Sequence, residues 1–310
     1  MSDAKLFRLG QGSVEELKSS SVAVEKSLQT LIEQHLDTFL GVRCLASEYS
    51  TGKNHGGRID TLGLDENGSP VIIEYKRALN QNVINQGLFY LDWLMDHQAD
   101  FKWLVLNRIG KDAADGIDWS APRLLCIAGD FTKYDEHATK QINRSIELIR
   151  YRRYADEFLL LGLVNATSSD AGAREPAKPS PNGGDPTSKK AADRTIEDRL
   201  NQAPPDVHDR YEALKDYLLA LGDDVQMKPA KDYFAFRRLK NFACVEVHPQ
   251  LKRISLYLKV DPDSVALEPG FTRDVRKIGH FGTGDLEVVV HTDEDMERAK
   301  PLILKSYAAS

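Results

Sequence analysis

The chain has 310 residues, of which 41% are hydrophobic, and its formal net charge is -6. The length suggests about two domains, and the apolar content is sufficient to build a core in each. The acidic balance excludes a protein that coats nucleic acid by bulk charge, so any contact with DNA must use local basic patches.

The spacing of cysteine, histidine and apolar residues excludes further classes of protein. The 3 cysteines form no Cys-x-x-Cys pair and the 8 histidines form no His-x-His or His-x-x-x-His cluster, which argues against a zinc site or a disulfide framework and fits a reducing cytoplasm. The longest apolar stretch, residues 158–164, is too short to span a bilayer, and the N-terminus lacks a signal-peptide pattern. We therefore expect a cytoplasmic protein with no membrane partner.

The first strongly periodic segment predicts a helix over residues 22–40. At 100° per residue Glu25 falls inside its apolar arc, whereas Glu33 points well away from it. An inward carboxylate needs a partner, because an unpaired buried charge costs several kcal/mol. We select Glu25 as the acid that this helix contributes to a site, with Glu33 in reserve.

Two strands are expected next, over residues 58–64 and 71–76. The second is rich in β-branched residues and ends in charge. Glu74 and Lys76 are two apart on it and therefore share one face. Carboxylates and a lysine at a strand end suit phosphodiester hydrolysis, because the acids can hold a divalent cation against the phosphate while the ammonium group steadies the attacking water.

The turn between the two strands decides whether Asp60 joins this face. With a two-residue turn, Asp60 would lie opposite Tyr75, on the wrong face. A three-residue turn with Gly68 in the left-handed conformation sets Asp60 directly across from Glu74. The chemistry of a shared metal site therefore predicts the odd-length turn, formed by residues 66–68.

A helix is expected after the second strand, with apolar residues at helical spacing from Val83 to Leu94. Gln86 and Tyr90 are four apart and lie together on a neighbouring face, from which they can reach the lysine or a nucleic-acid backbone. The loop before the first strand is basic and glycine-bearing, which suits a grip on phosphates; its His55 is also a candidate proton donor to the leaving oxygen. The residues that we expect to contact nucleic acid are Lys53, His55, Arg58 and Arg77.

In this order and context, the chain resembles the PD-(D/E)xK nuclease superfamily, and within it the RecB-like and single-strand or mismatch endonuclease group. The resemblance covers about residues 20–165 and implies an α/β restriction-endonuclease-like domain with an α-β-β-β-α-β core, dependence on Mg²⁺ or Mn²⁺, and cleavage of DNA. The catalytic residues that it implies are Asp60, Glu74, Lys76, Glu25, Gln86 and Tyr90, with Asp60, Glu74 and Glu25 as metal ligands.

Residues 166–193 are rich in Pro, Gly and Ser and predict a disordered tether. It separates a nuclease-like domain, residues 1–165, from a C-terminal domain, residues 194–310. The C-terminal domain is expected to be a smaller α+β fold with a mainly antiparallel sheet. Its expected elements are a helix over 207–221, strands over 232–239, 243–248, 254–260 and 286–291, a short helix over 272–278, and a closing helix over 293–307 capped by Thr292 or Asp293.

The C-terminal domain resembles an uncharacterised family sometimes labelled a predicted transport protein, but we reject transport because no membrane segment is present. Residues 226–280 contain 11 basic and 6 acidic residues with aromatic residues among them, a combination that can grip phosphates and stack on bases. The alternative is that Phe234 and Phe236 are simply the core side of a strand. We expect this domain to serve recognition or assembly.

The function that we expect is therefore a metal-dependent DNA endonuclease acting in repair, restriction or phage defence. Two alternatives stay open. One is a nucleic-acid-binding protein that does not cleave, and the other is a protein-interaction scaffold acting through the C-terminal domain. A homodimer is compatible with the sequence, which does not distinguish duplex, single-stranded and branched DNA.

Overall fold

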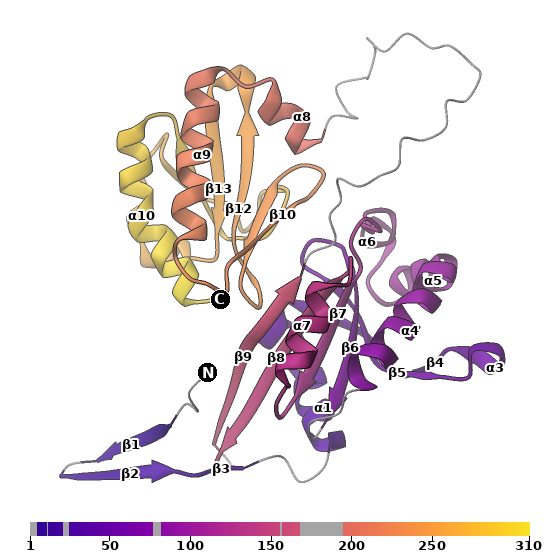
Figure 1. The fold of residues 1–310 in the computed structure, drawn as a ribbon. Helices are drawn as coiled ribbons and strands as arrows, with labels where there is room; N and C mark the ends of the chain where they lie inside the picture. Colours follow the sequence, from indigo (N-terminus) through magenta and orange to yellow (C-terminus); the bar gives the residue numbers. More distant parts are fainter. Residues whose placement is uncertain (1–4, 11, 21–24, 77–81, 156, 168–194) are drawn as a thin grey trace, which may run out of the picture. The chain divides into compact units, whose positions relative to one another are not determined.

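The computed structural model describes the whole chain except residues 1–4, 11, 21–24, 77–81, 156 and 168–194 (Figure 1). The chain divides into two compact units, Met1–Ala173 and Arg174–Ser310. Most of the expected tether lies outside the described residues. Its first two residues belong to a strand that ends at Thr167, so the first domain extends two residues beyond the expected boundary at 165.

The first unit is built on a seven-stranded mixed sheet in the order β3-β8-β7-β6-β5-β4, with β9 paired to β8. Strands β4, β5 and β6 form an antiparallel meander, whereas β6, β7 and β8 run parallel. The strands are β3 (Ser19–Ser20), β4 (Val42–Ser50), β5 (Arg58–Asp65), β6 (Pro70–Lys76), β7 (Arg123–Ala128), β8 (Ser145–Tyr154) and β9 (Phe158–Thr167), and a separate hairpin consists of β1 (Leu6–Gly10) and β2 (Ser13–Leu17).

Helices cover both faces of this sheet. The element order α1, β4, β5, β6, α4, β7 is the expected α-β-β-β-α-β succession. Helix α4 approaches one face closely because Gly87 has no side chain: a Cβ there would clash with the methyl groups of Leu124. The helices are α1 (Glu25–Gln34), α2 (Leu36–Leu40), α3 (Gly52–His55), α4 (Asn82–Asp96), α5 (Gln98–Arg108), α6 (Lys111–Asp115) and α7 (Lys133–Lys140).

The single helix expected over residues 22–40 is two helices. Helix α1 ends at Gln34, and α2 begins at Leu36 after a break at His35, whose ψ of 29° is not helical. Apolar spacing continues through the break, because Ile32 and Leu36 are both buried. Periodicity alone therefore does not reveal it.

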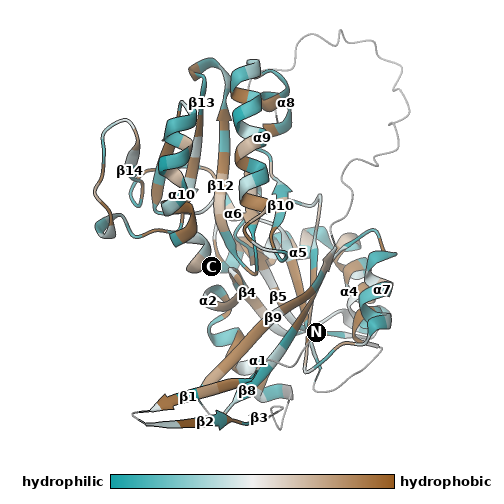
Figure 2. Ribbon diagram, turned by 60° about the vertical axis from the view of Figure 1, so that its left-hand side comes forward, coloured by the Kyte–Doolittle hydropathy of each residue, from teal (hydrophilic) through white to brown (hydrophobic). Residues whose placement is uncertain are grey.

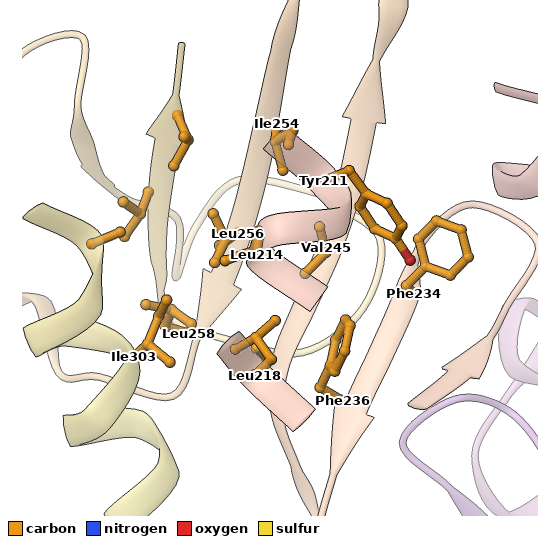
Figure 3. Close-up of a cluster of buried hydrophobic side chains, with 14 of the residues drawn as sticks. Tyr211, Leu214, Leu218, Phe234, Phe236, Val245, Ile254, Leu256, Leu258 and Ile303 are labelled. Carbon is orange, nitrogen blue, oxygen red and sulfur yellow. The ribbon is translucent and has the colours of Figure 1, made fainter. Parts of the chain in front are cut away.

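The second unit is a six-stranded antiparallel sheet in the order β10-β11-β12-β13-β15-β14. Helices α9 and α10 pack on one of its faces, and Figure 3 shows side chains of the core that they share with it. The elements are α8 (Ile196–Asn201), α9 (Pro205–Leu219), β10 (Gln226–Pro229), β11 (Phe234–Arg237), β12 (Asn241–His248), β13 (Arg253–Leu258), β14 (Thr272–Asp274), β15 (Leu286–Val290) and α10 (Asp293–Ala308), with short 3-10 turns at Pro249–Leu251 and Pro262–Ser264.

Two details of the second unit bear on its sequence predictions. The short helix expected over 272–278 is wrong: Thr272–Asp274 is the edge strand β14, paired with β15. The expected cap of the last helix is confirmed, because Thr292 accepts a hydrogen bond from the N–H of Asp295 in a capping box.

The nucleic-acid hint in residues 226–280 is not supported by the side chains. Phe234 and Phe236 are buried in the core beneath α9 (Figure 3), so the alternative of a strand core is correct. Tyr233 and Tyr257 are buried as well. Some of the basic charge is already paired, as at Arg276, which forms ion pairs with Asp261, Asp263 and Asp274.

Candidate active site

The turn between β5 and β6 sets the relative position of the two strand acids. Gly68 has a φ of 78°, in the left-handed region, and closes a three-residue turn. The strand register pairs Thr61 with Ile73, so the next pair along the strands is Asp60 with Glu74. The predicted odd-length turn is confirmed, and both acids lie on the same face of the sheet.

Two hydrogen bonds hold these acids against the neighbouring backbone. The N–H of Asp60 donates to Oε1 of Glu74 at 3.2 Å, and the N–H of Tyr75 donates to Oδ2 of Asp60 at 3.0 Å. Lys76 follows two residues after Glu74 and therefore leaves the strand on the same face. Tyr75 is turned to the opposite face, where it is buried and its hydroxyl group lies 3.4 Å from that of Thr61.

The electrostatic state of Glu74 is unusual. Its side chain is fully buried, and among the described atoms its Oε2 has no hydrogen-bond partner. Burial, together with the nearby carboxylate of Asp60, raises the pKa of Glu74 to about 9, although Lys76 opposes the rise. Asp60 and Glu74 thus form a pair of adjacent carboxyl groups, one of which has an oxygen without a hydrogen-bond partner in the described part of the chain. A divalent cation bound there would neutralise the negative charge of the pair.

Gln86 and Tyr90 hold the beginning of β5 in place through hydrogen bonds. The hydroxyl oxygen of Tyr90 accepts hydrogen bonds from the backbone N–H of Arg58 at 3.1 Å and from Nε2 of Gln86 at 3.2 Å. Gly57 leaves room for this contact, because a Cβ there would lie 2.5 Å from the ring of Tyr90. The hydrogen bonds of Gln86 and Tyr90 therefore hold the beginning of the strand that carries Asp60.

Tyr90→Phe should therefore destabilise the first unit while leaving its core packing intact. The change leaves the N–H of Arg58 without its acceptor, and an unsatisfied, partly buried donor costs about 1–3 kcal/mol. Urea unfolding followed by tryptophan fluorescence measures this loss in the first unit alone, because all three tryptophans, Trp93, Trp103 and Trp119, lie there. An unchanged free energy of unfolding would show that the hydroxyl group has no such bracing role.

The reserve acid, Glu33, lies on the other face of the sheet. Its Oε1 accepts hydrogen bonds from the hydroxyl of Thr61 at 2.5 Å and from Nε2 of Gln29 at 2.9 Å. Thr61 alternates with Asp60 along β5, so Glu33 does not join the pair of strand acids. Gln29 also donates to the backbone carbonyl of Asp60 at 2.8 Å, which ties α1 to β5 at the level of the site. Helix α1 begins at Glu25, one turn before Gln29, and the side chain of Glu25 lies outside the described residues.

A carboxylate that the sequence pattern does not reveal links α1 to β5. Oε1 of Glu48 lies 2.6 Å from Nζ of Lys26, and its Oε2 lies 2.5 Å from Nε of Arg58. The hydrogen bond from Lys26 is the largest of the effects that lower the pKa of Glu48. Glu48 has a φ of 53°, a conformation that glycine adopts more readily, and the register of β4 with β5 shifts earlier in the strand, between Cys44 and Ala46. The loss of strand alternation in β4 hides this residue from a search by strand period.

The four basic residues expected to meet nucleic acid have different surroundings. Lys53 is exposed on α3, and Arg58 is exposed while paired with Glu48. His55 stacks on Phe89 with ring centroids 3.7 Å apart, and its Nε2 lies 3.0 Å from the carbonyl oxygen of Phe89. These contacts give His55 a structural role in fastening α3 to α4. Arg77 lies outside the described residues.

The donor set at this site fits a hard cation. Among the described side chains no group of three or more His, Cys, Asp or Glu residues could hold a metal ion. The two oxygen donors, Asp60 and Glu74, leave positions for water or phosphate, as Mg²⁺ and Mn²⁺ prefer. The buried, unsatisfied Oε2 of Glu74 is the observation that favours a cation there.

Comparisons with known proteins agree with the division into two units. Residues 196–310 match the family described as "Domain of unknown function (DUF5655)". An uncharacterized protein of Haemophilus influenzae is 27% identical over 311 residues, which cover 96% of this chain and 98% of that protein.

Two solved structures are similar at low level. One is a repair endonuclease from Pyrococcus abyssi, with a TM-score of 0.29, 18% identity, and coverage of 44% of this chain and 50% of that chain. The other is the EndoMS-dsDNA2 complex, with a TM-score of 0.29, 14% identity, and coverage of 47% of this chain and 64% of that chain. Both scores are too low to carry an assignment. The described residues contain no helix long and apolar enough to cross a membrane.

Proposed function

We propose that the first unit is a divalent-metal-dependent endonuclease of the PD-(D/E)xK type that hydrolyses DNA phosphodiester bonds. The observation that carries this proposal is the pairing of Asp60 with Glu74 on one face of β5 and β6, with Lys76 two residues further along. The pair stands at the end of adjacent strands. The carboxyl group of Glu74 is buried, and its Oε2 has no hydrogen-bond partner among the described atoms, which destabilises the fold.

The acids, the lysine and the Gln86–Tyr90 pair have different tasks in such a site. Asp60 and Glu74 would hold Mg²⁺ or Mn²⁺, which supplies Lewis-acid stabilisation of the phosphate and lowers the pKa of bound water. Lys76 would orient the attacking water and offset developing negative charge. Tyr90 and Gln86 would keep Asp60 at a fixed distance from Glu74 by bracing the start of β5.

A third carboxylate would come from α1. Gln29 fastens this helix to the carbonyl of Asp60, and the helix begins one turn earlier, at Glu25. We therefore retain Glu25 as the third metal ligand. Lys53, Arg58 and Arg77, the residue that follows Lys76 in the sequence, would contact the phosphate backbone of DNA. His55 is held by its contacts with Phe89.

The experiment that tests this function is a cleavage panel. Purified full-length protein is incubated with labelled duplex, single-stranded, branched and mismatched DNA and with RNA, in Mg²⁺ or Mn²⁺ and in EDTA. We expect metal-dependent cleavage of at least one DNA substrate in a buffer with the pH and salt concentration of the cytoplasm. Binding without cleavage under all metal conditions would favour a non-cleaving nucleic-acid-binding protein, and neither binding nor cleavage would favour an interaction scaffold.

A further inference from the structure

The first unit exposes an apolar hairpin at its N-terminal end. The register of β1 and β2 pairs Leu9 with Val14, and Phe7 lies two residues before Leu9 on the same face. We call the hairpin of β1 and β2 the arm, and its side chains Phe7, Leu9 and Val14 the arm face. Leu9 is 78% exposed and Val14 is 69% exposed. An isolated two-stranded hairpin is marginally stable in water, so an arm with this face outward lacks the burial that would stabilise it.

The arm lies beside a second apolar surface, strand β9. Arg8 of the arm forms an ion pair of 2.9 Å with Glu157, the residue directly before this strand. Strand β9 is largely hydrophobic in colour in Figure 2, and its Phe158 and Leu160 are both more than two fifths exposed. Arg8 alternates with Phe7 and Leu9 along β1, so the ion pair holds the other face of the hairpin to the beginning of β9 and leaves the arm face outward.

Strand β9 is also an edge of the sheet, and it lacks the usual protection. Among the described strands it pairs with β8 alone, and its ten residues include no charged residue and no proline. The edge strand β4 carries Arg43, Glu48 and a register shift. In the second unit, β10 has only four residues, with Lys228 and Pro229, and β14 has only three, with two of them charged. Three edges thus carry the features that prevent strand pairing, and β9 does not.

We propose that β9 and the arm face form a homodimer interface. Antiparallel pairing of β9 with the same strand of a second copy is self-complementary about a two-fold axis, which makes this chain its own fitting partner. The pairing would centre on the regular part of β9, Phe158–Leu163, before the register shift with β8. The arm of each copy then covers apolar surface of the other, which helps to reach the roughly 800 Å² per partner that a stable interface buries.

This interface does not depend on the proposed nuclease activity. Strand β9 is separated from β6 by β8 and β7, about 14 Å across the sheet at the usual strand spacing. Oligomeric state can therefore be measured without metal or DNA. Failure of the dimer would leave the endonuclease proposal untouched, and an inactive protein could still dimerise.

Sedimentation velocity of the full-length chain, over about a hundredfold range of concentration, tests the interface. The wild type should sediment as a dimer of 34.7 kDa chains. Leu160→Lys should raise the dissociation constant about a hundredfold, because it removes a leucine that the dimer would bury and places a positive charge in each copy at the shared interface. Leu9→Glu, on the arm, should weaken the dimer independently and guards against a folding defect in the strand variant.

The matched control is Leu251→Lys, which changes a leucine of the second unit whose exposure lies between those of Leu160 and Leu9. It should leave the dimer intact. A wild-type chain that is monomeric at all concentrations would overturn the proposal. So would a dimer that survives both Leu160→Lys and Leu9→Glu, since its interface must then lie elsewhere.

Discussion

Metal-dependent cleavage is expected to fall at least a thousandfold when Glu74→Gln or Asp60→Asn is introduced. Either change replaces a charged ligand by an amide of the same shape and removes several kcal/mol of stabilisation of the developing charge. Initial rates of cleavage on the best substrate of the panel, at saturating Mn²⁺, measure the loss.

The control for these variants is Glu136→Gln, which changes a glutamate on α7 in the same unit. It should cleave at the wild-type rate. Both site variants should fold, because the amide oxygen that each substitution introduces can still accept the backbone hydrogen bond that the carboxylate accepts now. A folded Glu74→Gln protein with wild-type cleavage would remove Glu74 from the chemistry.

In the absence of metal, Glu74→Gln is expected to stabilise the first unit at pH 8. The pKa of Glu74 rises from its ordinary value of 4.5 to about 9 in the folded chain. Between these values the folded state binds a proton that the unfolded state does not, so the contribution of this group to stability is fully present below about pH 4.5 and is lost as the pH rises to about 9. Glutamine is neutral over this whole pH range, so the variant does not lose stability from this position as the pH rises.

Thermal unfolding followed by tryptophan fluorescence, in EDTA at pH 5 and pH 8, measures the effect. At pH 8 the variant should melt about 5 °C or more above the wild type, and the gap should narrow at pH 5. A variant that is less stable than the wild type at both values would mean that the carboxylate is stabilised in the metal-free chain.

The hairpin of the candidate site could be predicted from the sequence because its constraints are local. The alternation of Glu74 and Lys76 needs only strand geometry, and the left-handed turn at Gly68 needs only the position of a glycine. The requirement that Asp60 face Glu74 then selects one of two registers, and that register is the observed one.

The parts that could not be predicted depend on contacts between distant segments. Glu48 and Gln29 bind partners in β5, and no helical or strand period marks them as important. The position of Glu33 depends on its partner Thr61, which lies on the face opposite the strand acids. The expectation of a helix at β14 is wrong because three residues carry too little periodicity to distinguish a strand from a helix.

The central claim is that Asp60 and Glu74 hold a divalent cation, and calorimetric titration of Mn²⁺ into the metal-free protein tests it most directly. We predict binding to the wild type that Glu74→Gln and Asp60→Asn abolish. Lys76→Met should keep this binding although it blocks cleavage, because the lysine acts on water rather than on the metal. Mn²⁺ binding that is absent from the wild type, or equally strong in Glu74→Gln, would contradict the account.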